Sequence, residues 1–155
     1  ESTIIRLSPH FTLAEFTASA TAERLDIDNS MPEQLLPAAR LLAVNILEPV
    51  RERFGMTRLN SGYRCLALNR AVGSSDGSQH PRGEAADLRV PGVENRLVAE
   101  FIRDECAFDQ LILENVRAGV LGSGWVHVSY RAGRLRRQVL TKIVGERGYR
   151  QGLVA

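Results

Sequence analysis

The most informative stretch of the sequence is a loop and the strand that follows it, Ser78-Gln79-His80-Pro81-Arg82-Gly83-Glu84-Ala85-Ala86-Asp87. The loop is rich in glycine and serine, and Gly83 allows a sharp bend before the chain becomes extended. Two small residues, Ala85 and Ala86, keep this region uncrowded. The stretch therefore predicts a loop that presents His80 close to a strand that carries Asp87.

A second stretch has the alternation of a strand with one apolar face, Gly124-Trp125-Val126-His127-Val128-Ser129-Tyr130. Successive side chains point to opposite faces, so if Val126 and Val128 face the core, His127 faces a site. Two histidines and one aspartate are a ligand set for zinc, because imidazole nitrogen and carboxylate oxygen both suit this ion. The alternative is that His80, Asp87 and His127 are unconnected residues.

The chain around these stretches has the size and composition of one globular domain. It has 155 residues, 44% hydrophobic and 25% charged, and single cores commonly close at about 100–200 residues. This composition argues against disorder, collagen and coiled coil. The net charge of +2 does not indicate a nucleic-acid partner. We interpret one arginine cluster as a solvated turn or a contact to an anionic polymer: Arg131, Arg134, Arg136 and Arg137.

Membrane and disulfide signals are weak in this sequence. No apolar run approaches the ~18–20 residues that a membrane-spanning helix needs. The first residues lack the order of a signal peptide, in which charged residues precede an apolar stretch. Because the chain starts without Met, a signal peptide that has been removed is the open alternative. Cys65 and Cys106 either form one bridge or remain thiols, and we expect thiols because a core of this size needs no covalent staple. His10 is expected at the surface.

Hydrophobic spacing predicts helices in the first half of the chain and strands in the second. A capping box at residues 12–15 starts a short helix, another covers 20–25, and a long buried helix lies between Pro32 and Phe54 with a kink at Pro49. The expected strands are 57–62, 85–90, 108–114, 124–130 and 138–144, and two further helices are 66–72 and 94–106. This order favours a single α+β domain over residues 1–155 rather than a parallel α/β sheet.

The two stretches together resemble the zinc peptidases of family M15, the D-Ala-D-Ala carboxypeptidase group that includes bacterial cell-wall carboxypeptidases and phage endolysins. The resemblance lies in Ser78-x-His80-x-x-Gly83-x-Ala85-x-Asp87, followed about forty residues later by Trp125-Val126-His127. It extends to the segments 61–64, 108–114 and 11–16, and so covers roughly residues 10–131.

The resemblance implies a small antiparallel sheet with flanking helices, of the D-Ala-D-Ala-peptidase and Hedgehog type. It implies a Zn²⁺ cofactor with three ligands, His80, Asp87 and His127. It also favours a substrate contact at Arg64, since a guanidinium can clamp a carboxylate or stabilise the charge that develops on a carbonyl oxygen. Three further residues are expected to line the substrate pocket, Ser78, Gln79 and Trp125.

One position departs from the family pattern. Many relatives carry an aspartate or glutamate as catalytic base three residues before the last histidine, and here that position is Gly124. We expect Glu114 to be the base instead, because a hairpin of its strand with the strand of His127 places it beside Trp125 and diagonal to His127. The other interpretation of Glu114 is a solvated strand-end carboxylate. Glu84 is the competing base, but strand alternation is expected to point it outward.

These observations lead to a zinc metallopeptidase that hydrolyses peptidoglycan stem peptides, either as a D-Ala carboxypeptidase or as an endopeptidase of the endolysin kind. The alternative is a non-catalytic zinc-containing module that binds the cell wall or belongs to a phage particle, because Gly124 removes the usual base. We expect a monomer whose partner is a peptidoglycan peptide, with no nucleic acid and no transmembrane segment. The expected place of action is the bacterial cell wall or periplasm.

Overall fold

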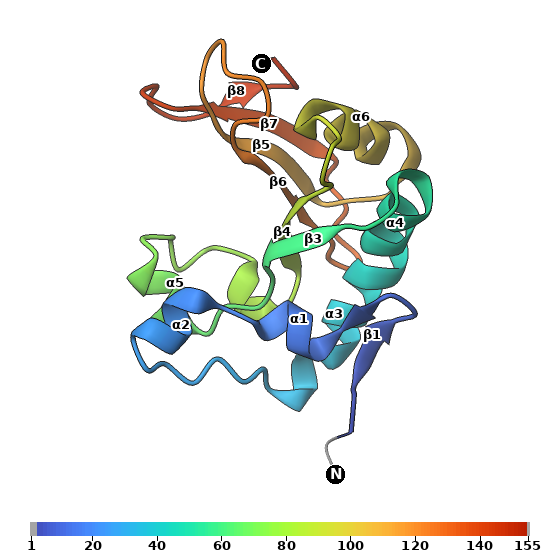
Figure 1. The fold of residues 1–155 in the computed structure, drawn as a ribbon, viewed down its shortest axis with the longest axis vertical. Helices are drawn as coiled ribbons and strands as arrows, with labels where there is room; N and C mark the ends of the chain where they lie inside the picture. The colour runs from blue at the N-terminus through green and yellow to red at the C-terminus, as the bar shows by residue number, and fades with distance from the viewer. Residues whose placement is uncertain (1–2, 155) are drawn as a thin grey trace.

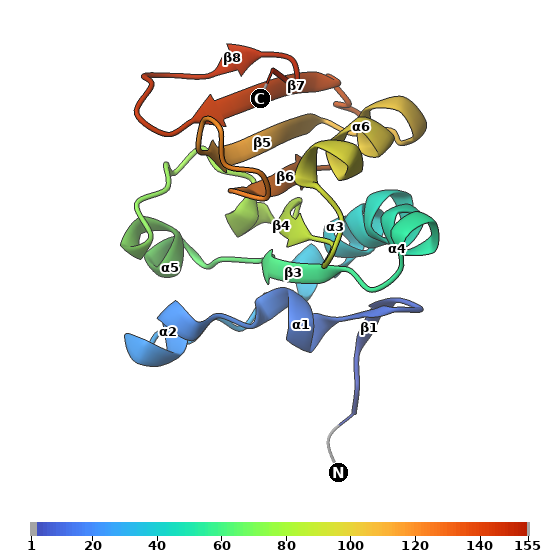
Figure 2. The ribbon, with the colours of Figure 1, turned by 45° about the horizontal axis from the view of Figure 1, so that its top comes forward.

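A six-stranded sheet forms the centre of the fold, in a computed structural model that describes residues 3–154 (Figures 1 and 2). The strand order is β3-β4-β6-β5-β7-β8. The strands are β3 (Arg58–Ser61), β4 (Ala85–Arg89), β5 (Gln110–Val116), β6 (Trp125–Ser129), β7 (Gln138–Ile143) and β8 (Arg150–Gln151). With its helices this sheet has the α+β architecture that the sequence predicts.

One parallel pair interrupts the antiparallel order of this sheet. β5 and β7 run parallel, whereas the other neighbouring strands of the sheet are antiparallel. The chain reverses in residues 130–137 after β6 and passes to the far side of β5. Because β5 and β6 are themselves antiparallel, this reversal gives β7 the direction of β5.

Helices cover one side of the sheet. They are α3 (Leu36–Leu42), a π-helical segment (Ala43–Leu47), α4 (Glu48–Phe54) and α6 (Asn95–Glu105), and Figure 2 shows α4 and α6 on the same side. The apolar stripe predicted for the long helix is fully buried at Leu42, Ile46 and Val50. Burying one such side chain stabilises the fold by roughly 1.5–3 kcal/mol. This helix therefore supplies core that does not depend on any metal.

The kink predicted at Pro49 takes the form of the π-helical segment before it. Proline has no N–H to donate to the carbonyl four residues earlier, which is that of Asn45. The N–H of Glu48 instead donates to the carbonyl of Ala43, five residues back. The long helix is thus continuous but changes its hydrogen-bond register once.

The N-terminal elements support the segment that leads into the site. A small sheet pairs β1 (Arg6–Ser8) with β2 (Phe11–Thr12), and the predicted capping box of Thr12 and Glu15 starts α1 (Leu13–Thr17). The fold also contains α2 (Ala20–Arg24), a 3₁₀ turn (Glu33–Leu35) and α5 (Leu66–Ala71). Phe16 of α1 lies so close to Gly62 that a Cβ there would be 2.4 Å from it. Only glycine fits at position 62, where β3 leads toward Arg64.

Both cysteines are free thiols, Cys65 half-buried and Cys106 buried. The disulfide alternative is therefore not realised in the structure. Among residues 3–154, no helix combines the length and the apolarity that crossing a bilayer requires.

A buried carboxylate holds the segment between β6 and β7 against the sheet. The side chain of Asp109 is fully buried and accepts hydrogen bonds from Nε of Arg136 at 2.7 Å and from Nη2 of Arg134 at 3.1 Å. Arg137 lies over the ring of Phe108 and donates to two backbone carbonyls. The predicted turn is exposed at Arg134, Arg136 and Arg137, and the structure adds that Arg134 and Arg136 also pair with a buried carboxylate.

We expect the free energy of unfolding to fall as the pH drops from about 4 to about 2. Burial raises the pKa of Asp109, but hydrogen bonds from Arg136 and Arg134 outweigh it and lower the pKa from 3.8 to about 2. A carboxylate with a depressed folded-state pKa stabilises the protein above its unfolded pKa and loses that contribution as pH falls through the folded value. At ~1.4 kcal/mol per pKa unit, the contribution is about 2 kcal/mol.

Urea unfolding of the wild type and of Asp109→Asn over this pH range tests the expectation. The wild type should lose about 2 kcal/mol more than the variant between the two ends of the range. Equal pH dependence in both proteins would show that Asp109 does not carry the effect.

Candidate metal centre

Two neighbouring strands and one turn bring three metal-ligating side chains together. Asp87 of β4 and His127 of β6 are directly opposite each other in the ladder, so their side chains share a face. His80 comes from the 3₁₀ turn His80–Arg82, just before β4. Gly83 has a φ of +72° and ends this turn in the left-handed conformation that glycine adopts without strain. This bend directs the chain into β4.

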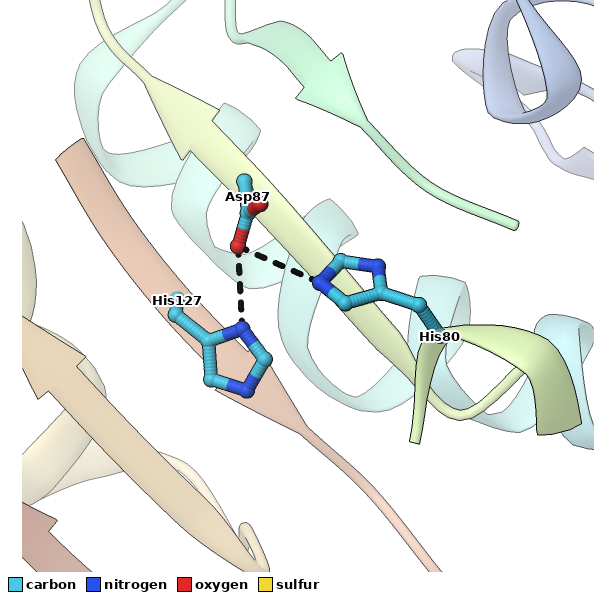
Figure 3. Close-up of side chains that lie close together, drawn as sticks. All are labelled: His80, Asp87 and His127. Atoms are coloured by element: carbon cyan, nitrogen blue, oxygen red, sulfur yellow. Dashed lines mark hydrogen bonds and ion pairs between the residues drawn. The ribbon is translucent and has the colours of Figure 1, made fainter. Parts of the chain in front are cut away.

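The three side chains point at one another (Figure 3). Nδ1 of His127 lies 2.9 Å from Oδ1 of Asp87, and Nε2 of His80 lies 3.4 Å from the same oxygen. One ligand atom from each residue lies within 4.8 Å of the others, and all three residues are buried. The structure therefore brings the predicted ligand set together, in a group that could hold a metal ion.

Backbone groups fix the orientation of His80. Its Nδ1 donates to the carbonyl of Gly62 at 2.6 Å, which leaves Nε2 to face Asp87. The backbone N–H of His80 donates to Oγ of Ser78 at 3.2 Å. Ligating histidines usually donate their second ring nitrogen in this way, because the bond fixes the ring and its tautomer. Ser78 thus holds the His80 turn and does not line the cavity, so the prediction that it lines the substrate pocket is wrong.

The electrostatics of the site favour the protonation states that bind metal. Burial lowers the pKa of His80 and so favours the neutral ring. Burial also raises the pKa of Asp87, but the neighbouring His80 and the hydrogen bond from His127 hold it well below its usual range. Neutral imidazoles and an ionised carboxylate are the forms that ligate a metal.

A cavity of about 340 Å³ opens in front of the three ligands. The other residues that line it are Arg64, Val72, Ser74, Glu114 and Trp125. Nη1 of Arg64 lies 3.9 Å from Oδ2 of Asp87. Nε of Arg64 donates to the side-chain carbonyl of Asn69, which is fully buried. Asn69 positions the guanidinium, and nothing in the sequence pattern indicated this residue.

Glu114 reaches the cavity through the hairpin that the sequence predicted. In the β5–β6 ladder Glu114 is opposite Trp125, and Ile112 is opposite His127. Glu114 is half-buried, and burial raises its pKa. Nε1 of Trp125 is buried and has no hydrogen-bond partner among the described residues. A carboxylate and an unpaired indole N–H therefore lie on the same face as the metal ligands.

A comparison with protein families identifies the family of this chain. A model of the family described as Peptidase M15 matches residues 9–129, which is most of the chain and includes His80, Asp87 and His127. The chain belongs to the Peptidase M15 family. It is a peptidase, a hydrolase of peptide bonds from a metallopeptidase family, and it acts on a peptide substrate. A comparison with curated proteins found none that matches this chain.

Two residues at variable positions within the family motif, Gln79 and Glu84, lie outside the cavity of this M15 chain. Nε2 of Gln79 donates to Oδ2 of Asp109 at 3.0 Å and to Oε1 of Glu84 at 3.2 Å. The prediction that Gln79 lines the pocket is therefore wrong, because its side-chain amide is hydrogen-bonded to the carboxylates of Asp109 and Glu84 instead of facing the cavity. The other oxygen of Glu84 lies 4.0 Å from Arg131. Glu84 thus points away from the metal ligands.

Gly124 cannot carry an acid in this backbone. Its φ is +77°, and a Cβ would lie 2.0 Å from the carbonyl oxygen of Glu114. Such a distance is far below any normal contact, and the neighbouring atoms are backbone that cannot move aside alone. The absence of a base at this position is thus built into the β5–β6 hairpin.

We expect Gln79→Leu to weaken zinc binding by roughly 10–100-fold, the usual effect of losing a partner that supports a metal ligand. The amide of Gln79 ties the His80 turn to Asp109, and leucine removes this tie while keeping the volume. Competition with a chromophoric zinc chelator measures the affinity. Glu84→Gln is the matched control, because it changes a partner of the same amide and should keep near wild-type affinity. Equal affinity of Gln79→Leu and wild type would contradict the expectation.

Proposed function

We propose that this M15 chain is a zinc-dependent peptidase that cleaves peptide bonds in peptidoglycan stem peptides, at the bacterial cell wall or in the periplasm. The observation that carries the proposal is the convergence of Nε2 of His80, Oδ1 of Asp87 and Nδ1 of His127 on one face of a cavity. Two imidazole nitrogens and one carboxylate oxygen are a common donor set of catalytic zinc. When bound, zinc lowers the pKa of water and polarises the scissile carbonyl.

Glu114 supplies the proton transfers that hydrolysis needs. Its carboxylate takes a proton from the attacking water and returns one to the leaving amine. Half-burial raises the pKa of Glu114, and a raised pKa brings a carboxylate closer to the range in which it both accepts and donates near neutral pH. Position and pKa therefore support the same role.

Arg64 and Trp125 orient the substrate in the same cavity. The guanidinium of Arg64 lines the cavity and is held at Nε by Asn69, and its Nη groups bind a substrate carboxylate or carbonyl as a fork. The side chain of Trp125 lines the same cavity and offers an apolar contact beside the metal ligands. Both contacts suit an extended peptide with carbonyl or carboxylate oxygens near the scissile bond.

Product analysis by mass spectrometry on defined muropeptides tests the function. The zinc-loaded protein should release new peptides, and a chelator should stop the release. Loss of a terminal D-Ala would make the protein a carboxypeptidase, and cuts inside the stem or cross-link would make it an endopeptidase. A zinc-loaded protein that binds cell wall but releases no peptide or amino acid would overturn the proposal in favour of a binding module.

A further inference from the structure

The sheet face that carries the metal centre continues past Glu114 onto the last two strands. Leu113 of β5 is paired with Thr141 of β7, and Thr141 is paired with Arg150 of β8. The next residues along the three chains are Glu114, Lys142 and Tyr149, where the β5–β7 register shifts and β8 begins. Side chains alternate between the two faces of a strand, so Glu114 and Lys142 lie on the face opposite to Leu113 and Thr141, and the Lys142 ammonium lies 5.9 Å from the centre of the Tyr149 ring.

Electrostatic interactions support this placement. Lys142 acts to lower the pKa of Glu114, and Glu114 acts to raise the pKa of Tyr149. Both effects require the side chains to be near one another. The residues 142–149 lie beyond the part of the chain that matches the family, which ends at residue 129.

Lys142 holds the turn that carries Tyr149. Its ammonium donates to the carbonyl of Gly148 at 3.2 Å and to that of Glu146, and it lies 5.9 Å from the centre of the Tyr149 ring. Tyr149 is half exposed, at 50%. Its hydroxyl has no hydrogen-bond partner within residues 3–154. An immobilised turn thus presents a ring and a free hydroxyl to solvent on the metal-centre face.

Strand spacing gives the distance of Tyr149 from the metal centre. From β6, which carries His127, to β8 there are three strand-to-strand steps, or roughly 14 Å at about 4.8 Å a step. An extended peptide advances about 3.3 Å per residue. After allowing for the length of the tyrosine side chain, this span corresponds to about two or three peptide residues from the scissile bond. Arg64 interacts with Asp87 of β4, which lies on the other side of β6.

We propose that Tyr149 is a substrate-binding residue that contacts the peptide two to three residues from the scissile bond, on the side of the metal centre away from Arg64. The proposal rests on the proposed peptidase function. In this arrangement the substrate is an extended peptide that crosses the strands from β4 to β8. It has residues on both sides of the bond that is cut. Peptides that are long enough to reach Tyr149 are therefore preferred over peptides that end sooner.

Steady-state kinetics on a long and a truncated stem peptide test the proposal with the zinc-loaded protein. Tyr149→Ala should lower kcat/KM for the long peptide by roughly tenfold, mainly through KM, as expected for one lost side-chain contact. The truncated peptide should be cleaved at the wild-type rate. Val144→Ala, at an exposed position of the same turn, is the matched control and should change neither value.

The outcomes separate the two proposals. Tyr149→Phe distinguishes the ring from the hydroxyl, and a loss confined to the long peptide supports the subsite in either case. No loss in Tyr149→Ala, or an equal loss on both peptides, overturns it. If the wild type cleaves neither peptide, the proposed function fails, and fluorescence anisotropy with the labelled long peptide takes over. Tenfold weaker binding by Tyr149→Ala then supports the subsite, and unchanged binding overturns it.

Discussion

Replacing Glu114 with glutamine is expected to lower turnover by roughly 10²–10⁴, the usual contribution of general acid–base catalysis. Glutamine keeps the size and shape of the side chain but cannot accept the proton of the attacking water. Glu114 is not among the three ligand residues, so zinc content should stay at the wild-type level. Rates on purified muropeptides, with zinc measured by elemental analysis on the same samples, check both statements.

Glu84→Gln is the control for this substitution. Glu84 is a carboxylate inside the family motif, but it faces Gln79 and Arg131 and does not line the cavity. Its replacement should cost little activity. Near wild-type cleavage by Glu114→Gln would refute the assignment, and a large loss in Glu84→Gln would move the role of base to Glu84.

Replacing His80 with alanine is expected to abolish tight zinc binding and, with it, activity. His80 is 1% exposed and supplies one of only three ligand atoms in the group. The two that remain, on Asp87 and His127, come from adjacent strands and offer an incomplete set for this ion. The fold should survive, because the long helix buries its core independently of the metal. Zinc-to-protein ratios after dialysis and circular dichroism measure the two effects.

The third histidine of the chain provides the comparison. His10 is exposed, and its Nδ1 lies 2.6 Å from Oε1 of Glu48. Neither residue lines the cavity. His10→Ala should keep one zinc per chain and full activity. Full zinc occupancy in His80→Ala would refute its assignment as a ligand.

Local patterns predicted the features that depend on local geometry. The alternation of apolar and polar residues in 124–130 predicts which face of the strand His127 occupies. Side chains of any strand point to its two faces in turn, whatever the rest of the chain does. The capping box at Thr12 and the apolar stripe of the long helix are local for the same reason. The β5–β6 hairpin joins neighbours in sequence, so the position of Glu114 opposite Trp125 could also be predicted.

Partners that are distant in sequence could not be predicted in this way. Asp109 and Arg136 are separated by 27 residues, and His80 and Gly62 by 18. No spacing rule says which arginine a buried carboxylate will choose, or which carbonyl will accept from a ring nitrogen. The parallel strand β7 and the two-residue strand β8 depend on the same kind of choice, because strand direction follows from the path of the chain across the sheet. The prediction for Gln79 failed for the same reason, because its partner Asp109 is 30 residues away in the sequence.

The contact between Gly124 and the carbonyl of Glu114 links two positions that look independent in the sequence. Moving the acid from 114 back to 124 is not a matter of exchanging two side chains. A Gly124→Glu, Glu114→Gln double variant would meet the backbone at 2.0 Å and would have to reshape the hairpin first. With Glu114 in its proposed role, the position of the base is therefore fixed by the backbone of the hairpin in any evolved or engineered variant of this peptidase. A redesign that relocates the base must change the loop 117–124 together with both positions.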